Sequence, residues 1–199
     1  GDSSDSGGDW EDESDEEKRL HKIHDPHHRP HQLAHIIELM ERVRAKKALE
    51  QAGMAAEDLD LIIVATITPD TLTPATACYV QQQLGATEAV AFDISAACSG
   101  FLYAMKIAKR MIESGAFENA LIVGAEKLSA FVNWEDRTTC VLFGDGAGAA
   151  VLRASKEGEG RILATDIGTD GKQTHILNIP GGGSACPITS NNAGDGLAS

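Results

Sequence analysis

The chain has 199 residues, of which 42% are hydrophobic, 24% are charged and 5% are aromatic. This composition provides for a sizeable core and excludes a chain that is disordered throughout, a collagen and a disulfide-stapled small protein. Of the formal net charge of −13, residues 1–17 contribute nine acidic side chains and no basic one, and the remainder carries only −4. Neither part has the basic excess that nucleic-acid binding requires, so we expect no nucleic-acid partner.

The first 31 residues predict an acidic, His-rich tail without a folded core. Six of the seven histidines lie within residues 21–35. Their spacing is not that of a tetrahedral zinc site, and Pro26 and Pro30 interrupt any helix that would align them. We therefore expect adventitious metal affinity and no dedicated metal site. Without a secretory signal or an apolar run of about 18 residues, we expect a cytoplasmic protein with reduced cysteines and no membrane association.

From Gln32 onward the pattern predicts alternating helices and strands. Apolar residues at steps of three and four predict a helix over 32–52, which Gly53 ends. Thr73 and Pro74 predict the N-cap and first residue of a second helix, which ends at Gly85. The other predicted elements are buried strands at 61–67, 89–94 and 120–125, a helix at 99–114, two strands around a Gly-Asp-Gly turn within 140–152, and weaker strands at 161–167 and 175–179. Loop follows from 180. This alternation indicates an α/β layered fold.

The most distinctive segment places Cys98 between a predicted strand and the helix that follows it. A thiol at that junction lies near the positive end of the helix dipole, which favours the nucleophilic thiolate. Small neighbours leave room for a substrate carbonyl, and backbone N–H groups could stabilise an oxyanion. From these residues alone, the alternative that Cys98 is a small buried hydrophobic residue stays open.

Two segments carry a resemblance to a known family. The sequences ISAACSGFLYAM (94–105) and DRTTCVLFGDGAGAAVL (136–152), at this separation, resemble β-ketoacyl-acyl-carrier-protein synthase III, a member of the thiolase superfamily. The resemblance extends over residues 46–184. It implies a thiolase-like layered α/β/α half with one mixed sheet over residues 32–184, followed by a polar tail at 185–199.

The resemblance also implies a site and a reaction. Cys98 would accept an acyl group from acyl-CoA as a thioester, and decarboxylative condensation with malonyl-carrier protein would follow. Arg137 would pack by the CoA adenine, although it could equally be a surface arginine paired with Asp136 or Glu135. Phe143 would line the acyl pocket, a role compatible with a place in the core. The family implies no permanently bound cofactor, and its partners are acyl-CoA, acyl carrier protein and a second copy of the chain.

Three departures from the family limit this interpretation. Thr73 stands where the family often has an aromatic residue that reaches the partner subunit's acyl tunnel, so the starter acyl group stays open. The family's second half supplies a His and an Asn for condensation, and we do not assign His175 to that role. The family's opening strand has no counterpart in residues 1–31, and we do not equate Trp10 with the family tryptophan.

These observations leave several hypotheses. The chain is the N-terminal half of such an acyltransferase, or it is a non-catalytic dimerisation fragment or gene remnant. A third reading keeps the fold and Cys98 but assigns a polyketide-starter or hydroxymethylglutaryl-CoA synthase-like substrate. Because half of a two-half fold would leave an apolar surface exposed, we expect self-association.

Overall fold

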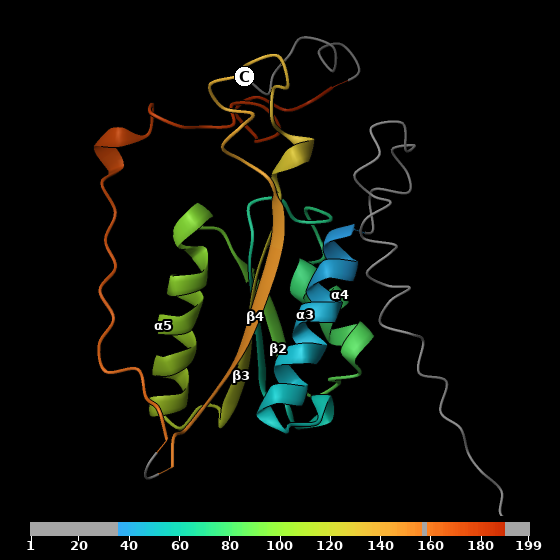
Figure 1. The fold of residues 1–199 in the computed structure, drawn as a ribbon, viewed down its shortest axis with the longest axis vertical. Coiled ribbons are helices and arrows are strands. Elements are labelled where there is room, and N and C mark those ends of the chain that lie inside the picture. Colours follow the sequence, from blue (N-terminus) through green and yellow to red (C-terminus); the bar gives the residue numbers. More distant parts are fainter. Residues whose placement is uncertain (1–35, 157–158, 190–199) are drawn as a thin grey trace, which may run out of the picture. The chain divides into compact units, whose positions relative to one another are not determined.

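The computed structural model describes residues 36–156 and 159–189, which form a four-stranded sheet with helices on both faces (Figure 1). The predicted tail at 1–31, the histidine cluster and the start of the first predicted helix lie outside the described residues. The strands are β1 (Leu61–Ala65), β2 (Val90–Ile94), β3 (Asn119–Lys127) and β4 (Asp145–Arg153). The helices are α3 (Ile36–Ala52), α4 (Thr76–Leu84) and α5 (Gly100–Glu113).

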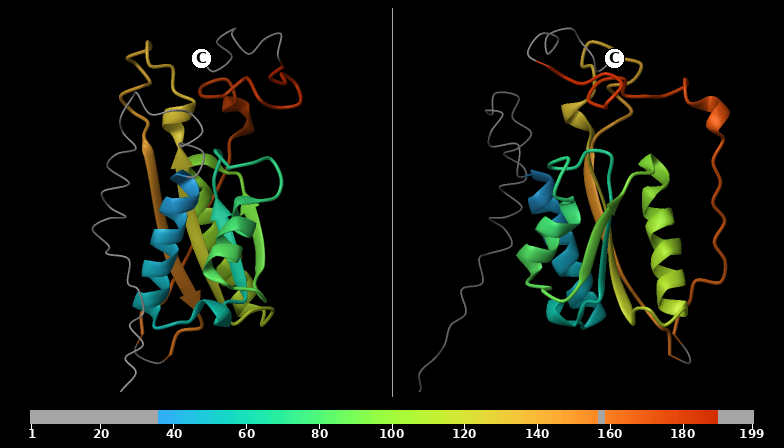
Figure 2. Two further views of the ribbon diagram at one scale, coloured as in Figure 1. Left: turned by 90° about the vertical axis from the view of Figure 1, so that its right-hand side faces the viewer. Right: turned by 180° about the vertical axis from the view of Figure 1, so that it is seen from behind.

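The sheet is mixed, with strand order β2-β1-β3-β4. Strand β1 runs parallel to both β2 and β3, whereas β4 runs antiparallel to β3 from the pair Lys127↔Asp145 to the pair Asn119↔Arg153. Figure 2 shows α3 and α4 on one face of the sheet and α5 on the other. This is the layered α/β/α half with one mixed sheet that the sequence predicted.

Two apolar clusters, one on each face of the sheet, form the core. All five residues of β1 are buried, and their side chains alternate between the clusters because successive strand residues point to opposite faces. Ile62 and Val64 belong to the cluster under α3 and α4, and Leu61 and Ile63 belong to the cluster under α5. This double coverage explains the uninterrupted apolar run of β1.

Strand β2 differs from its prediction as a buried strand. It is an edge strand of the described sheet, residues 91–94 are half-buried, and Val90 is 49% exposed. The apolar run AVAFDI predicted a buried strand, but β2 pairs with β1 alone in the described sheet, and that leaves its outer edge open.

Glycines end the three helices as the sequence predicted. Gly53, Gly85 and Gly115 follow α3, α4 and α5 with φ angles of +60°, +75° and +75°. Such left-handed backbone is accessible to glycine at little cost, and it turns the chain out of the helix.

The predicted start of α4 is wrong by two residues. The helix begins at Thr76 with Ala75 at the N-cap, and the Thr73–Pro74 peptide, which is cis, precedes it. The cap comes from another strand: the Asp93 carboxylate of β2 accepts hydrogen bonds from the backbone N–H groups of Thr76 (2.7 Å) and Ala77 (2.8 Å). A side chain of β2 therefore accepts the hydrogen bonds that a local N-cap side chain accepts in other helices.

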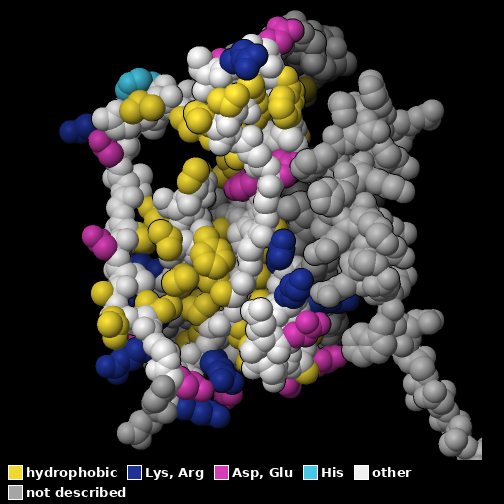
Figure 3. All heavy atoms as spheres, in the orientation of Figure 1, with side chains coloured by type: hydrophobic (Ala, Val, Ile, Leu, Met, Phe, Trp, Pro, Cys, Tyr) yellow, Lys and Arg dark blue, Asp and Glu magenta, His cyan; other side chains and the backbone are white. Residues whose placement is uncertain are grey.

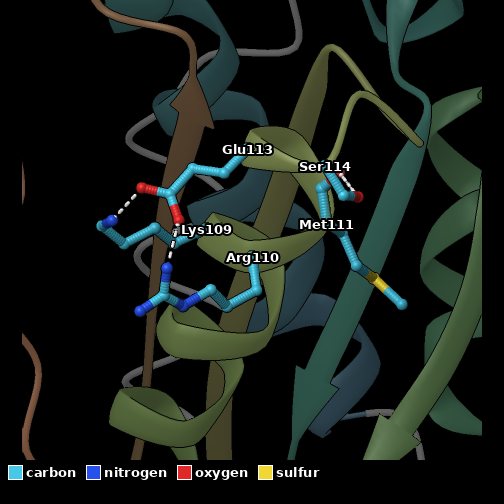
Figure 4. A network of polar contacts seen from close by, with 5 residues as sticks. All are labelled: Lys109, Arg110, Met111, Glu113 and Ser114. Carbon is cyan, nitrogen blue, oxygen red and sulfur yellow. Dashed lines mark hydrogen bonds and ion pairs between the residues drawn. The ribbon is translucent and has the colours of Figure 1, made fainter.

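The last turn of α5 carries an exposed ionic network (Figure 4). The Glu113 carboxylate pairs with Lys109 one turn earlier and with Arg110 at 2.8 Å. The hydrogen bond from Lys109 is the main cause that lowers the pKa of Glu113. These cations lie at the carboxyl end of the helix, where they complement its dipole.

The segment before β4 also differs from prediction. Residues 140–142 form turns, residues 143–144 have no regular structure, and β4 begins at Asp145, inside the Gly-Asp-Gly sequence. The backbone N–H groups of Cys140 and Leu142 bond locally to the carbonyls of Asp136 (3.0 Å) and Thr139 (2.9 Å), so they do not form strand pairs. The predicted strands at 161–167 and 175–179 also contain no strand, since no described sheet residue pairs with them.

Candidate functional site

The candidate site lies at the edge of the sheet where the three parallel strands end. Strand β2 leads to Cys98, β1 leads to the loop at 66–75, and β3 leads to the loop at 128–144, which is seen above the sheet in Figure 1. Ligands of α/β proteins characteristically bind outside the carboxyl ends of such strands. The described fold thus collects the predicted site residues on loops of one sheet edge.

Cys98 occupies the junction that the sequence predicted. It lies in a 3₁₀ turn, Ala97–Ser99, directly before the 14 residues of α5, and its side chain is exposed. The exposure excludes the alternative that Cys98 is a buried hydrophobic residue. Its neighbour Ala97 has a φ of +45°, a left-handed conformation that costs a non-glycine residue about 1–2 kcal/mol.

Close packing fixes the first turn of α5 against the sheet. A Cβ placed on Gly100 would lie 3.0 Å from the Ala65 Cβ at the end of β1. A Cβ on Gly124 of β3 would lie 3.2 Å from the Phe101 ring. The two glycines therefore let the helix approach both strands, and Cys98 is held two residues before that contact.

Sequence reasoning did not identify Glu126, which joins the ends of β1 and β3. Its carboxylate accepts hydrogen bonds from the Ile67 backbone N–H (3.0 Å) and the Thr68 hydroxyl (2.9 Å). Desolvation by burial raises the pKa of Glu126, and these hydrogen bonds oppose the shift without cancelling it. A carboxylate at the end of the apolar run ALIVGAEK was the signal available in the sequence, but its partners lie about 58 residues away.

Arg137 lies in an exposed position of the turn formed by the sequence WEDRTTC. The Asp136 carboxylate accepts hydrogen bonds from the Thr138 backbone N–H (2.9 Å), the Thr138 hydroxyl (2.6 Å) and the Thr139 hydroxyl (2.8 Å). The Thr138 hydroxyl is the main cause that lowers the pKa of Asp136. Within the described ranges Arg137 forms no ion pair with Asp136 or Glu135, so the predicted alternative of a paired surface arginine is absent.

Asp145 anchors the start of the same loop. Its carboxylate accepts hydrogen bonds from the Ser129 backbone N–H (2.8 Å) and hydroxyl (2.6 Å). Phe143, the predicted pocket residue, is half-buried two residues before Asp145, and Thr73 is exposed on the loop after β1. The structure thus places Cys98, Arg137, Phe143 and Thr73 on the same edge, although no hydrogen bond joins these four residues.

The surface around the site is rich in apolar side chains (Figure 3). Hydrophobic side chains gather between α5 and β4 and over the loop above them. The large exposed apolar residues of the 128–144 loop and of the C-terminal segment are Phe131, Trp134, Val141, Leu142, Leu163, Ile176, Leu177, Ile179 and Ile188. So much exposed apolar surface is unusual for a monomer.

Two features are absent from the described residues. Among the side chains that the structure places, no cluster of three His, Cys, Asp or Glu has the arrangement of a metal site. None of the helices over these residues is both long and apolar enough to cross a membrane.

The chain is similar to proteins described as 3-oxoacyl- or beta-ketoacyl-[acyl-carrier-protein] synthase III. Residues 92–171 match the family described as 3-oxoacyl-[acyl-carrier-protein (ACP)] synthase III. The beta-ketoacyl-[acyl-carrier-protein] synthase III of Desulfitobacterium hafniense is 55% identical over 145 residues, which are 73% of this chain and 44% of the relative. That of Clostridium perfringens is 58% identical over 137 residues, which are 69% of this chain and 42% of the relative.

Solved structures give the same result. The 3-oxoacyl-[acyl-carrier-protein] synthase III of Aquifex aeolicus has 58% identity and a TM-score of 0.60, with 61% of this chain and 39% of that chain covered. The enzyme of Pseudomonas aeruginosa has 40% identity and a TM-score of 0.69, with 80% and 47% covered. The chain therefore spans less than half the length of the relatives that it matches.

Proposed function

Since the chain belongs, over its matched residues, to the 3-oxoacyl-[acyl-carrier-protein] synthase III family, we propose that it carries the acyl-accepting half of such an enzyme. In this proposal the Cys98 thiolate attacks the thioester carbonyl of acyl-CoA. The bond to the CoA sulfur breaks, CoA leaves as a thiolate, and the acyl group remains on Cys98 as a thioester. The single observation that carries the proposal is an exposed Cys98 before α5, within the family-matched residues.

The surroundings of Cys98 support this step. The first N–H groups of α5 lie immediately after the thiol and stabilise negative charge on sulfur or on a carbonyl oxygen. The Arg137 guanidinium forms no ion pair with the described residues. A guanidinium can stack on an adenine and pair with phosphate. We assign Arg137 to CoA binding and Phe143 to the acyl pocket.

The proposal also includes the condensation step that would complete the reaction. In condensation, malonyl-carrier protein would lose CO₂, and the resulting carbanion would attack the acyl carbonyl carbon. The bond to the Cys98 sulfur would break, Cys98 would be released as a thiolate, and a 3-oxoacyl chain would form on the carrier protein. Fatty-acid chain initiation, acyl-CoA as substrate and acyl carrier protein as partner follow from the family. No permanently bound cofactor is proposed, and the cytoplasmic location expected from the sequence stays a prediction.

Intact-mass analysis after incubation with acetyl-CoA tests the acylation step. We expect one acetyl adduct on the 199-residue chain, and we expect Cys98→Ala to lose it. Cys140→Ala is the matched control, because it removes a half-buried thiol from the same edge and should keep the adduct. An adduct that persists in Cys98→Ala, or no adduct on wild-type chain shown to be folded by circular dichroism, would refute the proposal.

The exposed apolar surface favours a second candidate, a non-catalytic association fragment. The open edge of β2 and the apolar residues above the sheet offer two regions for contact. We propose self-association, as a dimer or a larger assembly, under either function. The association candidate alone predicts that Cys98 takes no acyl group while sedimentation still shows an assembly.

A further inference from the structure

We propose that Glu126 is a positioning residue for Cys98, because it joins the two strand ends on which the first turn of α5 rests. The inference deepens the proposed function and rests on it. Hydrogen bonds connect the four residues of this Glu126 network, which are Glu126, Ile67, Thr68 and Lys127.

The Glu126 network links the chain after β1 to the end of β3 through three hydrogen bonds. Two of them end on the Glu126 carboxylate, from the Ile67 N–H (3.0 Å) and from the Thr68 hydroxyl (2.9 Å). In the third, the Lys127 N–H donates to the Thr68 hydroxyl oxygen at 2.8 Å. The Thr68 hydroxyl therefore donates to Glu126 and accepts from Lys127, so it connects the Glu126 side chain with the backbone at the end of β3.

The network extends to the strand that leads to Cys98. Within the loop after β1, the Thr68 N–H donates to the Thr66 hydroxyl oxygen at 3.0 Å. The backbone N–H of Thr66 donates to the Ile94 carbonyl at 3.1 Å. Ile94 is the last residue of β2, four residues before Cys98. The ends of all three parallel strands are thus connected at this edge.

Packing transmits the position of these strand ends to the thiol. Gly100 lies against Ala65, which directly precedes the loop that Glu126 holds. Phe101 lies against Gly124, two residues before Glu126. If the ends of β1 and β3 separate, the first turn of α5 loses the surface against which it is seated. A misplacement of about 1 Å at a reacting group can cost on the order of 100-fold in rate.

The opposite edge of the sheet provides a matched control. There the Asp60 carboxylate, directly before β1, accepts hydrogen bonds from the N–H groups of Glu118 (2.7 Å) and Asn119 (3.2 Å) at the start of β3. Asp60 thus joins the same two strands by the same chemistry, but at their amino ends. Loss of Asp60 should cost stability without a selective effect on Cys98.

The test compares the full chain with its Glu126→Ala, Glu126→Gln and Asp60→Ala variants. The rate of iodoacetamide alkylation is measured separately for each of the four cysteines by peptide mass, and acetyl transfer from acetyl-CoA is measured in parallel. Alkylation does not depend on the proposed function. Cys78, Cys140 and Cys186 are half-buried, so they report general loosening of the chain.

For Glu126→Ala we expect alkylation of Cys98 to slow by about two- to fivefold, as the thiol leaves the positive end of α5. The three other cysteines should keep their rates, and acetyl transfer should fall on the order of 10- to 100-fold. Glu126→Gln should restore both rates, since an amide still accepts from the Ile67 N–H and can donate to the Thr68 oxygen. Asp60→Ala should leave the Cys98 rate unchanged.

Several results would overturn the inference: an unchanged or faster Cys98 rate in Glu126→Ala, equal slowing in Asp60→Ala, or faster alkylation of all four cysteines. If Glu126→Ala does not fold, Thr68→Val replaces it, because valine keeps the shape and removes the hydroxyl. It should also slow Cys98 selectively, and no change would refute the positioning role. If wild-type chain takes no acetyl group while the alkylation pattern holds, the proposed function fails and the positioning role stands.

Discussion

Replacement of Asp93 by alanine should remove the cap of α4 and lower the free energy of unfolding by about 2–4 kcal/mol. The carboxylate receives two hydrogen bonds, of 2.7 Å and 2.8 Å, from Thr76 and Ala77. Both donor residues are fully buried, so water cannot replace the carboxylate. Each unsatisfied buried donor costs about 1–3 kcal/mol, and release of the desolvated carboxylate offsets part of the sum. Because a whole domain is stable by about 5–15 kcal/mol, this loss is easily measured.

Urea unfolding followed by circular dichroism gives the measurement. Asp93→Ala should shift the midpoint with an unchanged slope, which indicates a change in stability rather than in the exposed surface. Asp93→Asn keeps one acceptor oxygen and should lose about half as much. Glu88→Ala is the control, since it removes the same charge from an exposed position and should change the free energy by less than about 0.5 kcal/mol. A loss below that value for Asp93→Ala, or an equal loss for Glu88→Ala, would refute the capping argument.

Two further predictions concern the packing and the loop of the site. Gly100→Ala should destabilise the chain by about 1–3 kcal/mol in thermal unfolding, because the new Cβ would lie 3.0 Å from the Ala65 Cβ. Gly148→Ala is the control and should be tolerated, because no atom lies within 4 Å of the position of its new Cβ. Similar losses of stability in the two variants would contradict the packing argument. The lowered pKa of Asp136 means that its contribution to stability is present above its unfolded pKa and is lost as the pH falls through the folded value. Asp136→Ala should therefore show a smaller drop in urea midpoint between neutral pH and acid than wild type, and an equal drop would refute the argument.

The sequence predicts most elements of this fold because their signals are local. The apolar runs of β1 and β3 and the glycines after the three helices depend on near neighbours alone, and all are found. The junction around Cys98 is also local, since a strand, small residues and an amphipathic helix follow one another within residues 91–113. The predicted place of Cys98 between a strand and a helix is therefore confirmed, whereas the exposure of its side chain is known only from the structure.

Two of the errors arise where a distant residue decides the structure, and a third arises from local turns. Helix α4 begins at Thr76 because Asp93, 17 residues away, accepts its first N–H groups. Strand β4 begins inside the Gly-Asp-Gly sequence because the preceding residues form their hydrogen bonds in local turns. The role of Glu126 was missed because its hydrogen-bond partners lie in the loop after β1. That loop is close to Glu126 in space but remote from it in the sequence. The roles of Arg137 and Phe143 stay predictions, because binding depends on molecules that neither sequence nor fold contains.

The strand order has a consequence for the chain as it is made on the ribosome. Ile62 in β1 pairs with Leu121 in β3, 59 residues further along the chain. Synthesis proceeds at about 5–20 residues per second, so β3 is made roughly 3–12 s after the fully apolar β1. Before then only β2 is available to pair with β1. During this interval one edge of a strand without a single charge stays open to other chains. The polypeptide is therefore most exposed to misassembly during synthesis, while nascent chains lie close together, and not after the sheet is complete.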